Sequence, residues 1–347
     1  MGEKMGEFDL IERYFKRPEG EAVRAQLRAS GLVPLGIGDD CALLQPAPGT
    51  QLAISSDMLV EGRHFLSTVD PAALGHKALA VNLSDLAACG AKPLAFTLAL
   101  ALPQADEAWL APFSRGLLAL ADEHSCQLIG GDTTRGPLNI CITVFGEVPV
   151  INGKSQALLR SGAQVGDDIY VSGTLGDARL ALEVFRGTVS VPAEVFAQAR
   201  LRMERPTPRV ALGMALRGIA TAAIDVSDGL LGDLGHVLNA SRVGATIQTE
   251  ITINLIADYA IYTRATGQFD TLLSEKRRLN CVLAGGDDYE LAFTAPASAQ
   301  AAVLAASAQA NVRVTRIGHI DAAPGIRLLD AQGQLQPDDY YSFDHFA

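Results

Sequence analysis

The chain has 347 residues, of which 48% are hydrophobic and 19% charged, and its formal net charge is −11. These values are typical of a globular protein long enough for two domains, and the acidic balance disfavours nucleic acid and anionic membranes as partners. No apolar run approaches the roughly 20 residues that a membrane helix needs.

The cysteines and the first residues of the chain indicate its compartment. The N-terminal stretch MGEKMGEFDLIERYF lacks the apolar region of a signal peptide. The cysteines are odd in number, scattered and never arranged as C-x-x-C, which favours reduced thiols over disulfides or a metal site. We therefore expect a cytoplasmic protein. The cysteines are Cys41, Cys89, Cys126, Cys141 and Cys281.

The first half of the chain mixes predicted strands and helices. Hydrophobic periodicity predicts helices over 9–29, near 71–90 and near 106–124. The order of the elements lacks the strict βαβ alternation of a dinucleotide-binding domain. Short apolar runs between the helices predict strands at 38–45, 51–57, 96–102, 126–132 and 139–148.

The turn-rich stretch 149–168 predicts a seam between two domains, 1–149 and 150–347. Beyond it the order strand, Gly-containing turn, helix occurs three times, at 168–185, 221–238 and 281–310. The sequence therefore predicts an α+β fold in both domains.

Acidic residues recur beside Gly or Ser at the ends of the predicted strands. Strand ends gather at clefts, and a neighbouring Gly lets the backbone approach a ligand closely. Because like charges repel, a group of such acids stays ionised only with hard cations, and oxygen ligands favour Mg²⁺ or Ca²⁺. Each acid taken alone also fits an ordinary turn or a helix N-cap. The acids are Asp39, Asp40, Asp57, Asp132, Asp225, Asp228, Asp287 and Asp288.

One further acid lies inside a predicted helix. The stretch AVNLSDLAACGAKP, residues 80–93, has the spacing of a helix built from small and aliphatic residues, which Asp85 interrupts. Burying a lone carboxylate costs several kcal/mol unless a cation or a hydrogen-bond donor meets it. A metal ion and a polar side chain at a helix kink both fit, and the residues alone leave the two open.

Two Gly-containing stretches resemble nucleotide-binding loops without their spacing. A P-loop ending in NGKS, residues 152–155, requires Gly where Val148 stands. The stretch GIGDDC, residues 36–41, lacks the third Gly of a dinucleotide fingerprint. We therefore expect neither a P-loop nor a dinucleotide site.

Four basic side chains have two interpretations each. His64, in VEGRHF, closely follows the SSD segment and is either structural or part of the site. Arg160 binds a phosphate or is simply solvated, and Lys77 and Arg135 are candidates of the same kind.

Taken together, and in order, these stretches resemble the thiamine-monophosphate kinase family of the aminoimidazole-ribonucleotide synthetase-like superfamily. The resemblance extends over essentially the whole chain. It rests on GIGDDCALL, AISSDMLVEGRHF, KALAVNLSDLAACGAKP, LIGGDTTRGP, RSGAQVGDDIYVSGTLGD, RPTPR, AIDVSDGL and GGDDYEL.

The resemblance implies a fold and a set of site residues. The fold is an α+β domain whose sheet joins that of a dimer mate to form a barrel, followed by a second α+β domain. The implied Mg²⁺ ligands are Asp40, Ser55, Ser56, Asp57, Asp85, Asp132, Asp225 and Asp228. The implied ATP contacts are Gly131, Asp132, Arg160 and Ser227. The implied contacts to the acceptor substrate are His64, Asp287 and Phe343. Ser56 stands where the family often has Thr, and Asp287 where Glu is more usual.

The resemblance also implies the reaction, which is phosphorylation of thiamine monophosphate by ATP to give thiamine diphosphate. Several Mg²⁺ ions would bridge the two phosphates in line, and no general base is needed because the acceptor phosphate is already ionised. Two alternatives remain: a purine cyclo-ligase that uses the same ATP site, and a non-catalytic protein whose acidic loops bind Ca²⁺ for stability.

Overall fold

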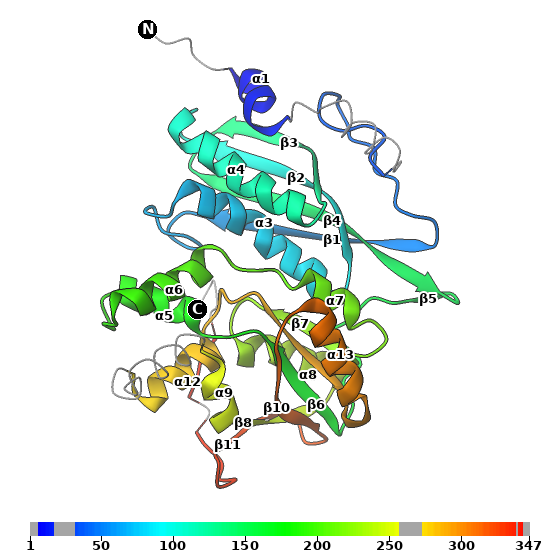
Figure 1. The fold of residues 1–347 in the computed structure, drawn as a ribbon, viewed down its shortest axis with the longest axis vertical. Helices are drawn as coiled ribbons and strands as arrows, with labels where there is room; N and C mark the ends of the chain where they lie inside the picture. The colour runs from blue at the N-terminus through cyan, green and yellow to red at the C-terminus, as the bar shows by residue number, and fades with distance from the viewer. Residues whose placement is uncertain (1–5, 17–31, 257–272, 338, 343–347) are drawn as a thin grey trace. The chain divides into compact units, whose positions relative to one another are not determined.

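The computed structural model describes residues 6–16, 32–256, 273–337 and 339–342 (Figure 1). The chain forms two compact units, one of Met1–Leu86 with Ala91–Gln156 and one of Ala87–Gly90 with Ala157–Ala347. The limits 1–149 and 150–347 stay a prediction, since residues 87–90 cluster with the second unit.

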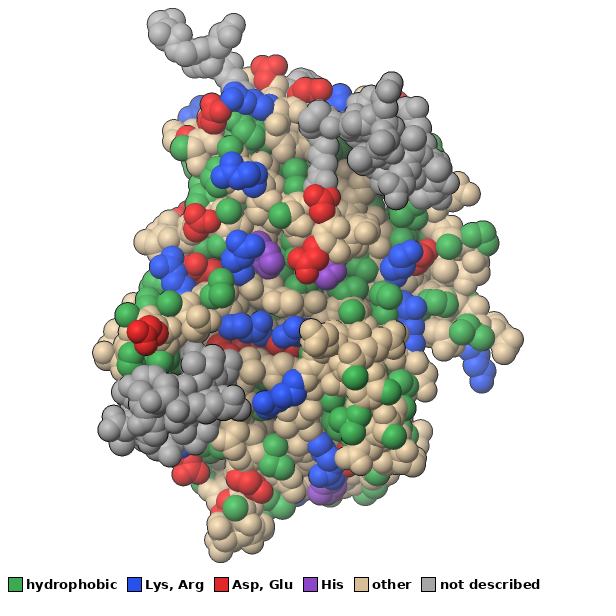
Figure 2. Space-filling view, in the orientation of Figure 1, with side chains coloured by type: hydrophobic (Ala, Val, Ile, Leu, Met, Phe, Trp, Pro, Cys, Tyr) green, Lys and Arg blue, Asp and Glu red, His purple; other side chains and the backbone are tan. Residues whose placement is uncertain are grey.

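Charged side chains of both signs are scattered over the face drawn in Figure 2, with hydrophobic ones between them. Such a mixture is typical of a surface in contact with water. Among the described helices, none combines the length and the apolar composition required to cross a membrane.

The first unit is built on a sheet with the strand order β1-β4-β2-β3, and β5 pairs with β4. Strand β4 is antiparallel to both β1 and β2, whereas β2 and β3 are parallel. The described strands form an open sheet with β1 and β3 at its edges. The strands are β1 (Thr50–Val60), β2 (Lys92–Leu102), β3 (Gln127–Arg135), β4 (Asn139–Ile151) and β5 (Lys154–Ser155).

Helices α3 (Pro71–Ala88) and α4 (Glu107–Glu123) lie side by side on one face of this sheet (Figure 1). A Cβ atom at Gly75 would lie 2.1 Å from the carbonyl oxygen of Phe113, and one at Gly116 would lie 1.9 Å from that of Ala72. The two helices therefore pack with their backbones in contact, which only Gly permits at these positions.

The predicted strands and helices from residue 50 to residue 148 are confirmed, with longer strands than expected. The strand predicted at 38–45 is wrong, because this segment makes only isolated bridges, Leu35 with Leu43 and Ile37 with Asp39. Gly38 has a φ angle of +125°, which turns the chain out of an extended conformation.

The N-terminal helix predicted over 9–29 is described only in part. Helix α1 (Glu7–Leu10) continues into the π-helical turn η1 (Ile11–Phe15). The remainder of the prediction falls on 17–31, outside the described residues.

The second unit is built on a mixed sheet with the strand order β11-β8-β10-β6-β9-β7. Neighbouring strands are antiparallel except β11 and β8, which are parallel. The strands are β6 (Asp167–Ser172), β7 (Ala222–Val226), β8 (Gly244–Gln248), β9 (Glu290–Pro296), β10 (Val314–Asp321) and β11 (Gly325–Leu329).

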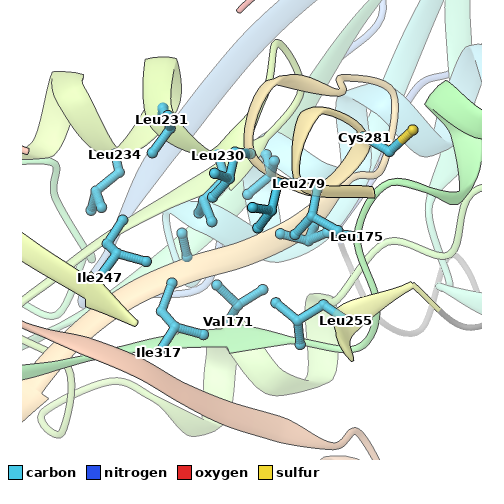
Figure 3. Close-up of a cluster of buried hydrophobic side chains, with 14 of the residues drawn as sticks. Val171, Leu175, Leu230, Leu231, Leu234, Ile247, Leu255, Leu279, Cys281 and Ile317 are labelled. Carbon is cyan, nitrogen blue, oxygen red and sulfur yellow. The ribbon is translucent and has the colours of Figure 1, made fainter. Parts of the chain in front are cut away.

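A core of aliphatic side chains joins this sheet to its helices (Figure 3). Leu230 and Leu234 of α8 and Leu279 of α12 are buried with Val171 of β6 and Ile317 of β10. This core fixes the start of α8 and the end of α12, beside which the acidic turns lie. Among the described residues, the helices of this unit are α5 (Asp177–Phe185), α6 (Ala193–Glu204), α7 (Val210–Ala215), α8 (Leu230–Ser241), α9 (Thr249–Thr252), η2 (Ile253–Leu255), α12 (Glu275–Ala284), η3 (Ala297–Ala299) and α13 (Gln300–Ala310).

Candidate functional site

In the first unit, strand β1 lies along helix α3 through polar contacts. The Ser55 hydroxyl donates a hydrogen bond to the Asp85 carboxylate. Two residues further along β1, the Asp57 N–H donates to Oδ1 of Asn82 at 3.1 Å. Asp85 is half-buried rather than buried, so its charge is not cut off from water. The partner that the structure gives Asp85 is therefore Ser55, and a metal contact stays a prediction.

Two other predicted ligands of this unit, Ser56 and Asp132, lie on the opposite face of the sheet. Side chains alternate between the two faces of a strand, so Ser56 points away from α3. Its hydroxyl lies 3.0 Å from that of Thr143 on β4. Asp132 shares this face, because it lies in the row that runs from Met58 through Cys141 and Ala99.

The strand spacing keeps Ser56 and Asp132 apart. They belong to the two edge strands β1 and β3, which are three strand spacings, or about 14 Å, apart. One copy of the sheet therefore does not bring their oxygen atoms onto a single ion. Asp40 is exposed, and its N–H donates to Oδ1 of Asp39 at 2.9 Å.

Gly131 shows why the stretch LIGGD needs its second Gly. Its φ angle is +150°, and a Cβ atom there would lie 1.8 Å from the carbonyl oxygen of Leu98 on β2. A side chain at 131 would thus push β3 away from β2, so Gly at this position permits the close pairing of the two strands beside Asp132.

His64 lies in the turn that follows β1. Its Nδ1 accepts a hydrogen bond from the Val60 N–H at 2.9 Å, and its carbonyl oxygen accepts one from Nζ of Lys77 at 3.2 Å. Lys77 has only 2% of its surface exposed. The buried Lys77 thus supports this turn through a hydrogen bond. The sequence alone did not distinguish this structural role from phosphate binding.

In the second unit, the turn between β7 and α8 is bound by a single carboxylate oxygen. Oδ2 of Asp233 accepts hydrogen bonds from the N–H groups of Ser227, Asp228 and Gly229, at 3.0, 3.1 and 3.1 Å. The pKa of Asp233 is raised to about 7, because burial and the nearby Asp228 charge, which raise it, outweigh the three N–H groups, which lower it. Asp233 therefore holds the backbone that carries two predicted ligand residues.

The segment that precedes β9 contacts the same turn. The Asp287 N–H donates to the Ser227 carbonyl at 2.8 Å. A Cβ atom at Gly286 would lie 2.4 Å from that carbonyl oxygen, so the second Gly of GGDDYEL permits the contact. The structure therefore brings together Ser227, predicted to contact ATP, and Asp287, predicted to contact the acceptor.

The remaining predicted residues of this unit are less informative. Asp225 lies on β7 with 5% of its surface exposed. Arg160 is exposed, and its carbonyl oxygen accepts from the Ser241 hydroxyl at 3.2 Å. Phe343 lies outside the described residues. The roles assigned to all these residues stay predictions.

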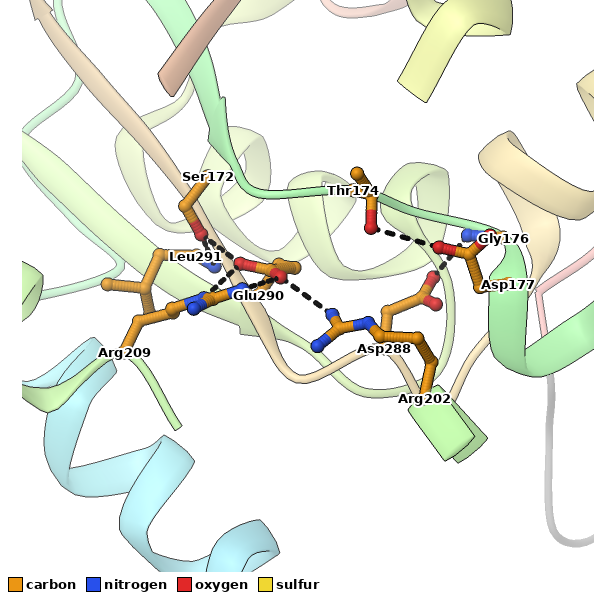
Figure 4. Close-up of polar contacts among 9 residues, drawn as sticks. All are labelled: Ser172, Thr174, Gly176, Asp177, Arg202, Arg209, Asp288, Glu290 and Leu291. Carbon is orange, nitrogen blue, oxygen red and sulfur yellow. Dashed lines mark hydrogen bonds and ion pairs between the residues drawn. The ribbon is translucent and has the colours of Figure 1, made fainter. Parts of the chain in front are cut away.

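A buried polar network adjoins this segment and was not expected from the sequence (Figure 4). Glu290 is fully buried and accepts from Nη2 of Arg202 at 2.7 Å, Nε of Arg209 at 2.6 Å and the Ser172 hydroxyl at 2.5 Å. The neighbouring Asp288 accepts from the Gly176 N–H at 2.8 Å through Oδ2, while its Oδ1 meets no hydrogen-bond partner among the described residues. The motifs RPTPR and GGDDYEL contain Arg209 and Glu290, but neither shows that the two residues meet.

The predicted metal ligands offer only carboxylate and hydroxyl oxygens, which is the donor chemistry that Mg²⁺ prefers. Within the described ranges, however, no group of three or more His, Cys, Asp or Glu side chains is arranged to hold a metal ion. The donors thus fit Mg²⁺ by chemistry, and their assembly around it stays a prediction.

Family models match both halves of the chain. Residues 38–148 match the N-terminal domain of AIR synthase related proteins, and residues 164–330 match the C-terminal domain. A curated thiamine-monophosphate kinase of Salmonella typhimurium (strain LT2) is 45% identical over 348 residues, which covers 99% of this chain and 98% of that protein.

Solved structures resemble the fold over nearly the same length. The crystal structure of thiamine-monophosphate kinase from Stenotrophomonas maltophilia K279a has a TM-score of 0.79 at 43% identity and covers 92% of this chain and 98% of its own. A structure of AaThiL complexed with AMPPCP and TMP has a TM-score of 0.70 at 28% identity and covers 94% and 97%. From these likenesses and the two matched domains, the chain belongs to the thiamine-monophosphate kinase family of AIR synthase related proteins.

Proposed function

We propose that this chain transfers the γ-phosphate of ATP to thiamine monophosphate and so produces thiamine diphosphate. The geometric observation that carries the proposal is the hydrogen bond from the Asp287 N–H to the Ser227 carbonyl, 2.8 Å long. It places a residue predicted for the acceptor directly beside one predicted for the nucleotide. Family membership, and a relative solved with an ATP analogue and TMP, support the same substrates.

The acceptor needs no general base in this reaction. Its attacking oxygen belongs to a phosphate with a second pKa of about 6, so it is already mostly ionised at neutral pH. The obstacle is repulsion, since two unit charges at about 4 Å repel by roughly 4 kcal/mol at an effective dielectric constant near 20. Binding and alignment of the two phosphates are therefore the main tasks of the protein.

The chain's own residues divide these tasks. The exposed Gly131 keeps β3 close to β2 beside Asp132, Ser227 offers a hydroxyl, and the exposed Arg160 offers a positive charge. Bound Mg²⁺ would supply charge neutralisation between the phosphates. We propose that several Mg²⁺ ions are held between them by Asp40, Ser55, Ser56, Asp57, Asp85, Asp132, Asp225 and Asp228.

The test is a product assay. The chain is incubated with ATP, MgCl₂ and thiamine monophosphate, and the products are followed by ³¹P NMR and by chromatography of thiamine diphosphate. We expect ADP and a new diphosphate in equal amounts. Release of inorganic phosphate without thiamine diphosphate would instead favour the cyclo-ligase reaction, and no nucleotide turnover at all would reject the proposal.

We also propose that two copies pair through the face of the first sheet opposite α3 and α4, and that the sheets of the two copies complete a barrel. This face of β1 presents large apolar side chains, with 44% of Leu52, 61% of Ile54 and 52% of Met58 exposed. Contiguous apolar side chains on a sheet face are typical of an interface rather than of a solvated surface. None of the five cysteines forms a disulfide, which supports the cytoplasm as the compartment of this dimer.

Light scattering coupled to size exclusion tests the pairing. We expect the mass of two chains for the wild type and of one chain for Ile54→Glu. Leu304→Glu, on helix α13 of the second unit, is the control, because Leu304 is 54% exposed yet far along the chain from this face. A monomeric wild type at micromolar concentration would reject the dimer.

A further inference from the structure

The segment from Gly286 to Glu290 sends its side chains alternately to two sides. Asp287 and Tyr289 are half-buried, whereas Asp288 and Glu290 have 2% and 0% of their surface exposed. The φ angles of Asp287 and Tyr289 are +71° and +53°, which is the left-handed region that side chains other than Gly rarely adopt. Two such residues in one short segment persist only where the surroundings hold them firmly.

The backbone of the segment is held by the neighbouring turn. The Asp287 N–H donates to the Ser227 carbonyl at 2.8 Å, and the Tyr289 N–H donates to the Val226 carbonyl at 2.9 Å. These bonds continue the pairing of β9 with β7 past the end of the regular ladder. They fix the backbone positions from which the side chains of Asp287 and Tyr289 extend.

The buried side chains hold the segment from the other side. Asp288 accepts from the Gly176 N–H, and Glu290 accepts from Arg202, Arg209 and Ser172 (Figure 4). The strained conformation is therefore fixed on both sides, and the direction in which Asp287 and Tyr289 point is fixed with it.

The result is a direct contact between these two side chains. The Tyr289 hydroxyl donates to Oδ1 of Asp287 at 3.1 Å. A carboxylate on a single Cβ rotates easily when solvated, and a hydrogen bond from a rigid phenol restricts that rotation. We propose that Tyr289 is a positioning residue, whose hydroxyl holds the Asp287 carboxylate in one orientation toward the acceptor substrate.

This inference rests on the proposed function, because it needs Asp287 to face the acceptor. A carboxylate only accepts hydrogen bonds, so the group that it recognises is a hydrogen-bond donor or a positive charge on the thiamine part. Tyr289 therefore affects recognition of the acceptor and leaves ATP binding unchanged.

The chain offers a matched control. Tyr170 on β6 also contacts the carboxylate two residues before it, with its hydroxyl 3.4 Å from Oδ2 of Asp168. That pair lies in a regular strand, and the Tyr170 ring stacks on Phe293 with centroids 5.3 Å apart. Tyr170→Phe and Tyr289→Phe thus remove the same atom from two similar pairs, and only one pair lies beside the predicted acceptor residue.

The experiment measures steady-state kinetics of the full chain with each substrate varied in turn. For Tyr289→Phe we expect the KM for thiamine monophosphate to rise by about fivefold, which corresponds to the typical net contribution of a single hydrogen bond. The kcat, the KM for ATP and the melting temperature stay near their wild-type values. For Tyr170→Phe we expect no change in either KM.

A double variant separates positioning from direct contact. In an Asp287→Ala background, Tyr289→Phe should raise the KM for thiamine monophosphate no further. An additional increase there would overturn the proposal, because Tyr289 would then contact the substrate itself. An unchanged KM for Tyr289→Phe alone, with an active wild type, would overturn it while leaving the proposed function standing; an inactive wild type would overturn both.

Discussion

The candidate residues of the two units are held in different ways. In the first unit they extend from long strands as single side chains, as in the contact of the Ser55 hydroxyl with half-buried Asp85. In the second unit they lie on short turns whose backbones are hydrogen-bonded, as in the three N–H groups that donate to Asp233.

This difference between the two units indicates which candidate residues affect activity without affecting stability. A half-exposed side chain contributes less to folding than a buried one, so its replacement changes chemistry more than stability. A turn fixed by buried carboxylates links the two properties, and a change there affects both. The predictions below test this contrast.

The largest effect is expected at Glu290. Glu290→Gln removes the buried charge that faces Arg202 and Arg209 and leaves two half-buried guanidinium groups without their counter-charge. We expect the free energy of unfolding to fall by about 3 kcal/mol or more, measured by urea denaturation. Glu107→Gln, which breaks the exposed pair with Arg13, should change it little. An equal fall in the free energy of unfolding of the two variants would contradict the expected difference between the buried and the exposed ion pair.

At Asp85 we expect a large loss of activity without loss of stability. Asp85→Asn keeps an acceptor for the Ser55 hydroxyl but removes the charge. We expect kcat to fall by about 100-fold or more, with a melting temperature within about 2 °C of wild type. Asp70→Asn, at the other end of α3, is the control, because Asp70 only accepts from the Ala72 and Ala73 N–H groups. Near-normal turnover of Asp85→Asn at limiting Mg²⁺ would remove Asp85 from the ligand set.

Replacement of Asp233 should reduce both stability and activity, the first by less than Glu290→Gln and the second by less than Asp85→Asn. Asp233→Ala leaves three N–H groups without their acceptor, so we expect unfolding to become easier by about 1–2 kcal/mol. The KM for ATP should rise as well, since Ser227 moves with the turn, and Asp233→Asn should restore part of both. Asp106→Ala, which removes the N-cap of α4, is expected to cost stability alone. A KM for ATP that is unaffected by Asp233→Ala would contradict the link.

The smallest effect concerns pH and two carboxyl groups of the second unit. Burial raises the pKa of Asp288 well above its usual value, so its contribution to stability is present below pH 4 and is lost as the pH rises. Burial also acts to raise the pKa of Asp321, but hydrogen bonds from Thr246 and Arg327 outweigh it and lower the pKa, so that contribution is lost as the pH falls below 4.

The two Asn variants should therefore respond to pH with opposite signs. Relative to wild type, Asp288→Asn should gain at least about 1 kcal/mol of stability between pH 4 and pH 8. Asp321→Asn should lose stability, relative to wild type, as the pH rises from 2 to 5. Chemical denaturation at four pH values measures both, and parallel curves for the three proteins would contradict the assignments.

The sequence predicted the regular elements well where hydrophobic periodicity was long. Strand β1 and helices α3 and α4 fall where the apolar residues recur, because burial of one face decides their conformation. The prediction of a strand at 38–45 was wrong for a local reason. Gly38 and the acids after it turn the chain before a strand can pair.

The site was predictable only in part. Acids beside Gly marked the turns at 225–229 and 285–288, and strand alternation already separates Ser56 from Ser55 and Asp57. The partners of Glu290 could not be predicted from the sequence. Arg202 and Arg209 lie 88 and 81 residues away and contact it only in the folded protein. Likewise, Asp85 gave no sign that its partner would be a hydroxyl 30 residues earlier.

The bonds from the Asp287 and Tyr289 N–H groups to the Ser227 and Val226 carbonyls have a consequence for exchanging parts between related enzymes. In a chimaera that receives only one of the stretches AIDVSDGL and GGDDYEL from another family member, the hydrogen bonds between the two stretches join backbones that come from two different proteins. Grafting experiments should therefore move the two stretches as a pair, however far apart they stand in the gene.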